Sequence, residues 1–117
     1  AIDDPQIGVV FMEVTRTVPP KDGFLEHVRR ITRDRNIVLI FDECTSGFRE
    51  TFGGIHKKFN ILPDLATFGK ALGNGYAITA LLGIDSVMEE AENSFISSTF
   101  WSERVGYAAG LAAIGIE

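Results

Sequence analysis

Hydrophobic residues along the chain occur in short runs that follow two different spacings. Residues 7–12 and 37–41 are almost continuously apolar, which is typical of strands covered on both faces. Between these runs, apolar residues at helical spacing predict a helix from Asp22, its expected N-cap, to about Asp34. The apolar residues of that helix are Phe24, Leu25, Val28 and Ile31. A strand, a helix and a second strand in this order predict a right-handed βαβ unit of a parallel sheet.

The rest of the chain continues this alternation without a repeat, a low-complexity tract or a linker. The pattern predicts a loop over residues 44–49 and a short helical segment over 53–59. It further predicts strands over 65–68 and 77–82, an acidic helix around 86–92, and an alanine-rich helix from about Ser102 to the end. One α/β unit with a mostly parallel sheet and flanking helices therefore accounts for the whole chain.

The composition is that of an ordinary globular protein. Of the 117 residues, 45% are hydrophobic and 23% are charged.

Because the chain begins at Ala1 and stops directly after a helical pattern, we expect it to be part of a longer protein and to be inactive alone. The single cysteine excludes an internal disulfide, and no apolar run approaches the ~20 residues that a membrane span needs. We therefore expect a cytoplasmic protein that does not bind membranes.

The charge of the chain argues against nucleic-acid binding. The formal net charge is −5, whereas proteins that bind nucleic acid usually present a basic face. One basic cluster lies near the end of the helix predicted over residues 22–34, where cations complement the helix dipole. A solvated helix end is the simpler interpretation of this cluster than a phosphate site. The cluster consists of Arg29, Arg30, Arg33 and Arg35.

Three ionisable side chains lie at the carboxyl ends of predicted strands, namely Glu13, Asp42 and Lys70. Because active sites of open parallel sheets lie at the carboxyl ends of the strands, we expect these three side chains to lie together at one edge of the sheet. Lys70 follows a short apolar run, where partial desolvation would favour the neutral, nucleophilic amine. Pyridoxal phosphate chemistry requires two groups from a protein. One is a lysine that forms an imine, and the other is an aspartate that keeps a pyridine nitrogen protonated. On local spacing alone, a solvated loop lysine is the simpler interpretation of Lys70.

Two motifs strengthen the chemical interpretation. Residues 42–49 read Asp-Glu-Cys-Thr-Ser-Gly-Phe-Arg, and residues 63–70 read Pro-Asp-Leu-Ala-Thr-Phe-Gly-Lys. They resemble the Asp-Glu-Val-x-Thr-Gly-Phe-Arg and Pro-Asp-Leu-x-Thr-x-Gly-Lys motifs of class III (subgroup II) aminotransferases, and the sequence looks closest to the glutamate-1-semialdehyde aminomutase-like members. The resemblance runs from residue 9 to about 113. It implies that residues 1–117 are the central part of a large domain of the pyridoxal-phosphate-dependent transferase fold (fold type I), without its phosphate loop and substrate domain.

The resemblance implies roles for individual residues. Lys70 matches the family's catalytic Schiff-base lysine, and Asp42 matches the carboxylate paired with the pyridinium nitrogen. Cys44 falls where the family usually has a valine on the cofactor ring face, and an inert core thiol is the simpler alternative. The implied activity is amino-group transfer between small molecules, as a transaminase or an aminomutase, with pyridoxal 5'-phosphate as cofactor.

The resemblance also implies a homodimer. Thr99 matches a threonine that reaches the cofactor phosphate of the neighbouring subunit. The residues around it are apolar and aromatic, as interface cores favour. They are Phe95, Ile96, Phe100 and Trp101. The alternative places this cluster in the core of the monomer, with Thr99 as the cap of the helix that begins near Ser102.

The sequence departs from the family at two positions. Val14 stands where a proline commonly follows the family's glutamate, and Ala77 stands where a proline often follows the glycine-rich turn and its aromatic residue. Both departures leave the cofactor residues intact, but the subfamily is not assigned by the sequence.

Functions of other classes fit parts of the sequence less well. A P-loop ATPase could use Asp42 and Glu43 for magnesium, but it needs an upstream G-x-x-x-x-G-K-S/T loop, and the Gly-Lys pair here lies downstream and precedes Ala71. A Cys44/His56 hydrolase lacks an evident oxyanion loop or third group. A non-catalytic binding relative of the same fold remains an alternative, although it would have no chemical need for both the aspartate and the lysine.

Overall fold

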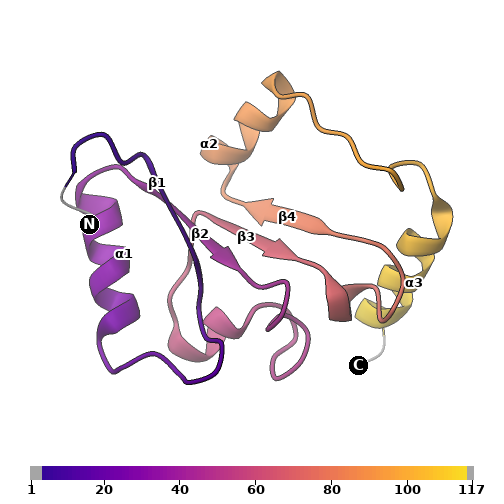
Figure 1. Ribbon diagram of the computed structural model, residues 1–117, viewed down its shortest axis with the longest axis horizontal. Coiled ribbons are helices and arrows are strands. Elements are labelled where there is room, and N and C mark those ends of the chain that lie inside the picture. Colours follow the sequence, from indigo (N-terminus) through magenta and orange to yellow (C-terminus); the bar gives the residue numbers. More distant parts are fainter. Residues whose placement is uncertain (1–3, 116–117) are drawn as a thin grey trace.

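The computed structural model describes residues 4–115, which form a four-stranded sheet with helices beside it (Figure 1). The strands lie in the order in which they occur in the chain, and the first three are parallel, whereas the fourth is antiparallel to the third. They are β1 (Val9–Glu13), β2 (Val38–Asp42), β3 (Leu65–Phe68) and β4 (Ala80–Gly83). The predicted α/β class with a mostly parallel sheet is therefore confirmed.

Helices connect and flank these strands. They are α1 (Phe24–Asp34), α2 (Asp85–Met88), α3 (Arg104–Gly115) and the 3-10 helices η1 (Ile55–Phe59), η2 (Lys70–Leu72) and η3 (Glu89–Asn93). The acidic helix expected over 86–92 is thus divided between α2 and η3. Within residues 4–115, no helix combines the length and the apolar character needed to cross a bilayer.

Several predicted boundaries differ from those of the structure. Gly23, not Asp22, precedes α1, with a left-handed φ of 75° that glycine adopts without strain. Residues 77–79 lead into β4 instead of belonging to it, because the Ala77 backbone packs against α3. The last helix begins at Arg104, shortly after its predicted start near Ser102. Its predicted end at residues 116–117 lies outside the described residues.

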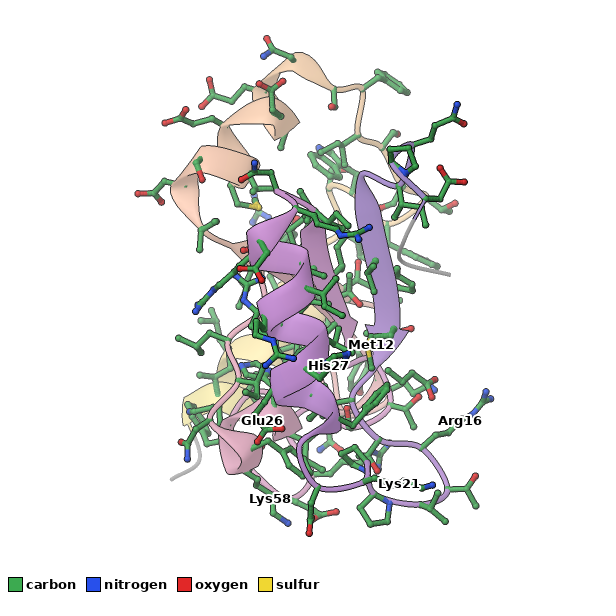
Figure 2. The ribbon with its side chains drawn as sticks, turned by 90° about the vertical axis from the view of Figure 1, so that its left-hand side faces the viewer. Met12, Arg16, Lys21, Glu26, His27 and Lys58 are labelled. Carbon is green, nitrogen blue, oxygen red and sulfur yellow. The ribbon has the colours of Figure 1, made fainter. Side chains whose placement is uncertain are left out.

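One face of the sheet is covered by α1, which lies in front of β2 with β1 beside it when seen from the helix side (Figure 2). Leu39 and Phe41 alternate along β2 and are fully buried against Leu25 and Val28 of α1. Burial of each such side chain contributes roughly 1.5–3 kcal/mol. A second cluster joins β3 to η2, the short helix that begins with the candidate lysine. Its buried members are Ala66, Phe68 and Leu72, and Phe48, Ile78 and Ala80 pack against them.

A buried ion pair ties α1 to the amino end of β3. Arg29 donates from both terminal nitrogens to Asp64, at 2.6 and 2.8 Å, and the backbone N–H of Leu39 donates to the same carboxylate at 2.8 Å. Burial by itself raises the pKa of Asp64, but the hydrogen bonds from Arg29 and Leu39 and the charges of Arg29 and Arg33 outweigh it and lower this pKa. The prediction that the whole basic cluster is solvated is therefore wrong for Arg29, whose side chain is only 12% exposed.

Candidate active site

Polar side chains from β1, β2 and β3 form a row across the carboxyl end of the parallel strands. Glu13 pairs in register with Asp42, and Asp42 pairs with Thr67. Their neighbours Met12 and Phe41 belong to the core under α1, so the row lies on the opposite face of the sheet. The structure thus places Glu13 and Asp42 side by side, as the sequence predicts, with Lys70 just beyond the end of β3.

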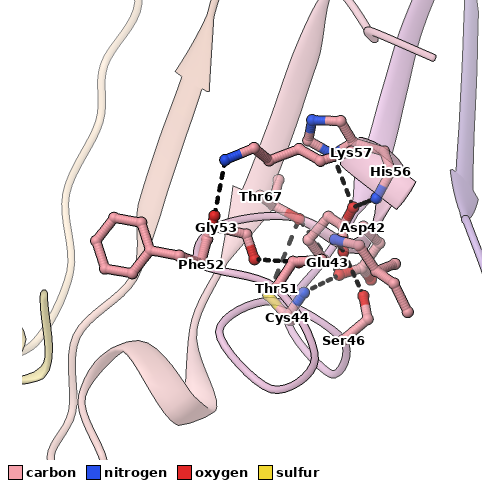
Figure 3. A network of polar contacts seen from close by, with 11 residues as sticks. Asp42, Glu43, Cys44, Ser46, Thr51, Phe52, Gly53, His56, Lys57 and Thr67 are labelled. Carbon is pink, nitrogen blue, oxygen red and sulfur yellow. Dashed lines mark hydrogen bonds and ion pairs between the residues drawn. The ribbon is translucent and has the colours of Figure 1, made fainter. Parts of the chain in front are cut away.

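Asp42 is held by one of its two carboxylate oxygens. Its Oδ1 accepts hydrogen bonds from the backbone N–H of Cys44 at 3.0 Å and from the hydroxyl of Thr67 at 3.3 Å (Figure 3). Within residues 4–115, no hydrogen bond involves Oδ2. A half-buried carboxylate with one anchored oxygen and one open oxygen is oriented to accept a charged donor such as a protonated ring nitrogen.

Lys70 is held by the loop that follows Asp42. Its Nζ donates a hydrogen bond of 2.7 Å to the hydroxyl of Thr45. The backbone of Lys70 has a φ of 41°, a left-handed conformation that is uncommon for a residue with a side chain and that recurs at functional sites. The expectation that Lys70 is partly desolvated is wrong. The residue is exposed and lies at the rim of a pocket.

This pocket has a volume of about 410 Å³ and lies between the lead-in to β4 and the start of α3. Aromatic side chains line it, including Tyr76, Trp101 and Tyr107. A Cβ on Gly106 of α3 would lie 2.4 Å from the carbonyl oxygen of Ala77, so a glycine is required for α3 to pack this closely. Pockets that bind small molecules are of this size.

Cys44 lies at the edge of the site, half-buried, and not in the core. Its thiol contacts the Thr67 hydroxyl at 3.9 Å, and a Cβ added at Gly69 would lie 3.5 Å from its sulfur. Burial, reinforced by the nearby charge of Asp42, raises the pKa of the Cys44 thiol even though the Thr67 contact lowers it. Cys44 therefore presents a small, neutral and largely apolar side chain next to Asp42.

Thr99 lies in a turn between η3 and α3. The residue directly before α3 is Glu103, so the alternative in which Thr99 caps this helix is wrong. The surrounding cluster is not buried among the described residues. Its exposed fractions are 97% for Phe95, 52% for Ile96 and Phe100, and 58% for Trp101. Within residues 4–115, these four side chains therefore form an exposed apolar surface, which another segment of a longer chain or a partner could cover.

Glu43 and His56 do not have the environment that the alternative functions require. Glu43 is fully buried, and His56 Nδ1 lies 2.8 Å from its carboxylate, whereas the Cys44 thiol faces Thr67. The described residues contain no Cys44–His56 hydrogen bond that could activate a hydrolase. They also contain no group of carboxylate, histidine or cysteine side chains that could hold a metal ion.

The contributions of Thr45 and Thr67 were not predicted from the sequence. Thr67 was recognisable in principle, because it is a polar residue at the end of an apolar strand and thus at the level of Asp42. Nothing in the sequence indicated that Thr45 would contact Lys70, because this contact depends on how the loop of residues 44–54 folds back.

Known proteins are similar in sequence to this chain over most of its length. The family model described as aminotransferase class-III matches residues 16–116. The 3-aminobutyryl-CoA aminotransferase of Cloacimonas acidaminovorans is 48% identical over 98 residues, and the glutamate-1-semialdehyde 2,1-aminomutase of Methanosphaera stadtmanae is 41% identical over 102 residues. These alignments cover 83% and 85% of this chain but only 24% of each relative. The chain thus spans about a quarter of the length of these curated relatives.

Solved structures share the fold. The FumI protein of Sphingopyxis sp. MTA144, solved in its PLP internal aldimine form, superimposes with a TM-score of 0.86 at 27% identity. The alignment covers 95% of this chain and 28% of that protein. The arrangement of the four strands and their helices is therefore a part of a larger known fold.

Proposed function

The chain belongs to the class-III aminotransferase family, and on this premise we propose that the full-length protein carrying it transfers amino groups with pyridoxal 5'-phosphate as cofactor. The observation that carries the proposal is the link between its two candidate functional groups. Cys44 and Thr45 are consecutive residues, and Cys44 holds the carboxylate of Asp42 while Thr45 holds the amine of Lys70. One short segment thus holds both an acceptor for a ring nitrogen and an amine for an aldehyde.

The residues of the chain fit this cofactor. When bound, pyridoxal phosphate supplies an electron sink for negative charge that develops next to the substrate nitrogen. Lys70 would hold the cofactor covalently through Nζ and later move a proton at the same atom. Asp42 would accept a hydrogen bond from the ring nitrogen at Oδ2 and keep that nitrogen protonated. Cys44 would contact the ring with its neutral thiol.

The proposal stops at amino transfer as the reaction class. Relatives of similar identity are named as an aminotransferase and as an aminomutase, so both reactions agree with the family. The amino donor and acceptor would be small molecules, in keeping with a pocket of about 410 Å³ next to Lys70. A cytoplasmic location stays a prediction.

The attachment of the cofactor to Lys70 is tested by trapping. Borohydride treatment of the full-length protein with bound pyridoxal phosphate should fix the cofactor irreversibly to the peptide that contains Lys70, and peptide mass spectrometry would locate it. The other lysines of this chain, Lys21, Lys57 and Lys58, are the internal controls. A label on another lysine would contradict the assignment, and a protein without any label would favour the non-catalytic binding relative.

The same proposal includes a homodimer in which Thr99 serves the site of the neighbouring subunit. Support comes from the exposed apolar surface of residues 95–101 and from α3, where Leu111 is 72% exposed and Tyr107 54% exposed. Large exposed apolar side chains of this kind are typical of interface cores. Thr99 would lie within this interface and donate its hydroxyl to the cofactor phosphate of the partner.

A hybrid dimer tests the contact across the interface. One subunit carries Thr99→Ala and the other carries Lys70→Ala, so only the first can attach the cofactor. If Thr99 acts across the interface, this one competent site receives an intact threonine from its partner and should keep wild-type cofactor affinity. Cofactor titration of the purified hybrid, followed at the absorbance of the lysine-bound cofactor, gives the affinity. An affinity as weak as that of the Thr99→Ala homodimer would instead place the contact within one chain.

A further inference from the structure

A fully buried carboxylate next to Asp42 has no part in the proposed chemistry. Both oxygens of Glu43 accept hydrogen bonds (Figure 3). Oε2 accepts the hydroxyl of Ser46 and the backbone N–H of Ile55, the latter at 3.0 Å. Oε1 accepts the backbone N–H of His56 at 3.0 Å and Nδ1–H of the His56 ring at 2.8 Å. We call these contacts the Glu43 network.

The Glu43 network closes the loop of residues 44–54. Ser46 lies near the beginning of this loop, whereas Ile55 and His56 begin η1 directly after it. Gly54 shows how tightly the end is packed, since a Cβ there would lie 2.3 Å from His56 Nδ1 and 2.8 Å from Glu43 Oε1. The buried carboxylate therefore fixes both ends of the loop to the end of β2.

This loop is the segment that holds the two candidate functional groups. Cys44, directly after Glu43, donates its backbone N–H to Asp42, and Thr45 accepts the amine of Lys70. Phe48, which packs against Phe68 of β3, anchors the middle of the loop. A change at Glu43 would thus reach Asp42 and Lys70 through the residues that contact them.

We propose that Glu43, together with His56, is a positioning residue that fixes the 44–54 loop and thereby sets the orientation of Asp42 and Lys70. The inference rests on the proposed function for what Asp42 and Lys70 do, but not for how the loop is held. It assigns to Glu43 and His56 a role that neither touches the substrate nor serves only the overall stability.

The charge of Glu43 is required because both of its oxygens act as acceptors. Burial by itself raises the pKa of Glu43, but the hydrogen bonds from His56, Ser46 and Ile55 outweigh it and lower this pKa, so the group is ionised. Glutamine has one acceptor oxygen and one donor NH₂ group. In either orientation of a glutamine amide, its NH₂ would face buried N–H donors and leave at least one of them unpaired.

The test compares Glu43→Gln with Asp64→Asn in the full-length protein prepared without cofactor. Asp64 is the matched control, because it is also a buried carboxylate that accepts from backbone and side-chain donors, but it lies at the amino end of β3, away from the 44–54 loop. Two rates report on the loop, and both are read peptide by peptide in a mass spectrometer. They are alkylation of Cys44 by iodoacetamide and acetylation of Lys70 by acetic anhydride relative to the exposed Lys21.

We expect Glu43→Gln to raise Cys44 alkylation by about tenfold, as the loss of one buried hydrogen bond allows, and to change the Lys70 to Lys21 acetylation ratio. Asp64→Asn should leave both readouts within about twofold of wild type, because additivity holds for sites without shared partners. Equal changes in both variants would reduce Glu43 to an ordinary stabilising residue, and no change in Glu43→Gln would also overturn the inference.

If Glu43→Gln does not fold, Ser46→Ala removes a single donor from the same network. It should raise Cys44 alkylation and change the Lys70 to Lys21 acetylation ratio, both by smaller factors than expected for Glu43→Gln. Unchanged rates in a folded Ser46→Ala protein would then overturn the inference. Neither readout needs the cofactor. A failure of the proposed function, seen as borohydride labelling away from Lys70, is therefore distinguished from a failure of this inference.

Discussion

Replacement of Lys70 by alanine should lower the turnover of the full-length protein by about 10⁴-fold, the upper end of what a positioned acid–base group contributes. The variant loses two functions of one atom, because Nζ would both attach the cofactor and move the proton. The amine is also the group that Thr45 holds at 2.7 Å, so no second amine in the described chain is oriented in the same way. Single-turnover kinetics, with the absorbance of the bound cofactor recorded in parallel, would measure both losses.

Two further variants separate the amine from its charge. Lys70→Arg keeps a cation that can still donate to Thr45, but a guanidinium stays protonated and cannot attack an aldehyde, so this variant should be as inactive as Lys70→Ala. Lys58→Ala removes an exposed lysine whose partner is Glu50, and it should keep wild-type turnover. Substantial activity in Lys70→Arg would mean that Lys70 contributes only charge.

The fold was predictable because its hydrophobic patterns are strong. Buried strands such as β2 read as continuous apolar runs, and α1 carries its apolar face at regular spacing, so the βαβ unit and the membership of the class III aminotransferase family were both expected and are both confirmed. Boundaries were less certain, since Gly23 starts α1 through its left-handed backbone and not through a capping side chain. That choice depends on backbone geometry, which a pattern of residue types does not contain.

The candidate site was predictable only as far as the motifs reach. Asp42 and Lys70 stand at strand ends, where parallel topology directs them to one side of the sheet. The exposure of Lys70 was not predictable, because it depends on the distant segment 96–107 that forms the pocket wall. The role of Glu43 was hidden for a related reason. Its partners Ile55 and His56 are 12 and 13 residues away in the sequence and offer mostly backbone donors.

The second large loss of turnover is expected on replacement of Asp42, whose Oδ2 has no hydrogen-bond partner among the described residues. Asp42→Asn keeps the shape of the side chain and an acceptor for Cys44 and Thr67, but it replaces the open carboxylate oxygen by an NH₂ donor or a neutral oxygen. A pyridine nitrogen facing this group would no longer be kept protonated. We expect turnover to fall by about 10²–10³-fold, the cost of removing one electrostatic group aimed at a developing charge.

Cofactor binding should survive this substitution better than turnover does, because Lys70 still attaches the cofactor. The measurement is therefore a pair of values for Asp42→Asn, namely the turnover at saturating substrate and the amount of cofactor retained after gel filtration.

Thr67→Val is the matched control, since it removes one hydrogen bond to Asp42 and leaves the charge in place. It should lower turnover much less than Asp42→Asn does. Near-normal turnover of an Asp42→Asn protein that holds its cofactor would show that the carboxylate does not serve the ring nitrogen. A loss in Thr67→Val as large as that in Asp42→Asn would show that orientation of the side chain matters more than its charge.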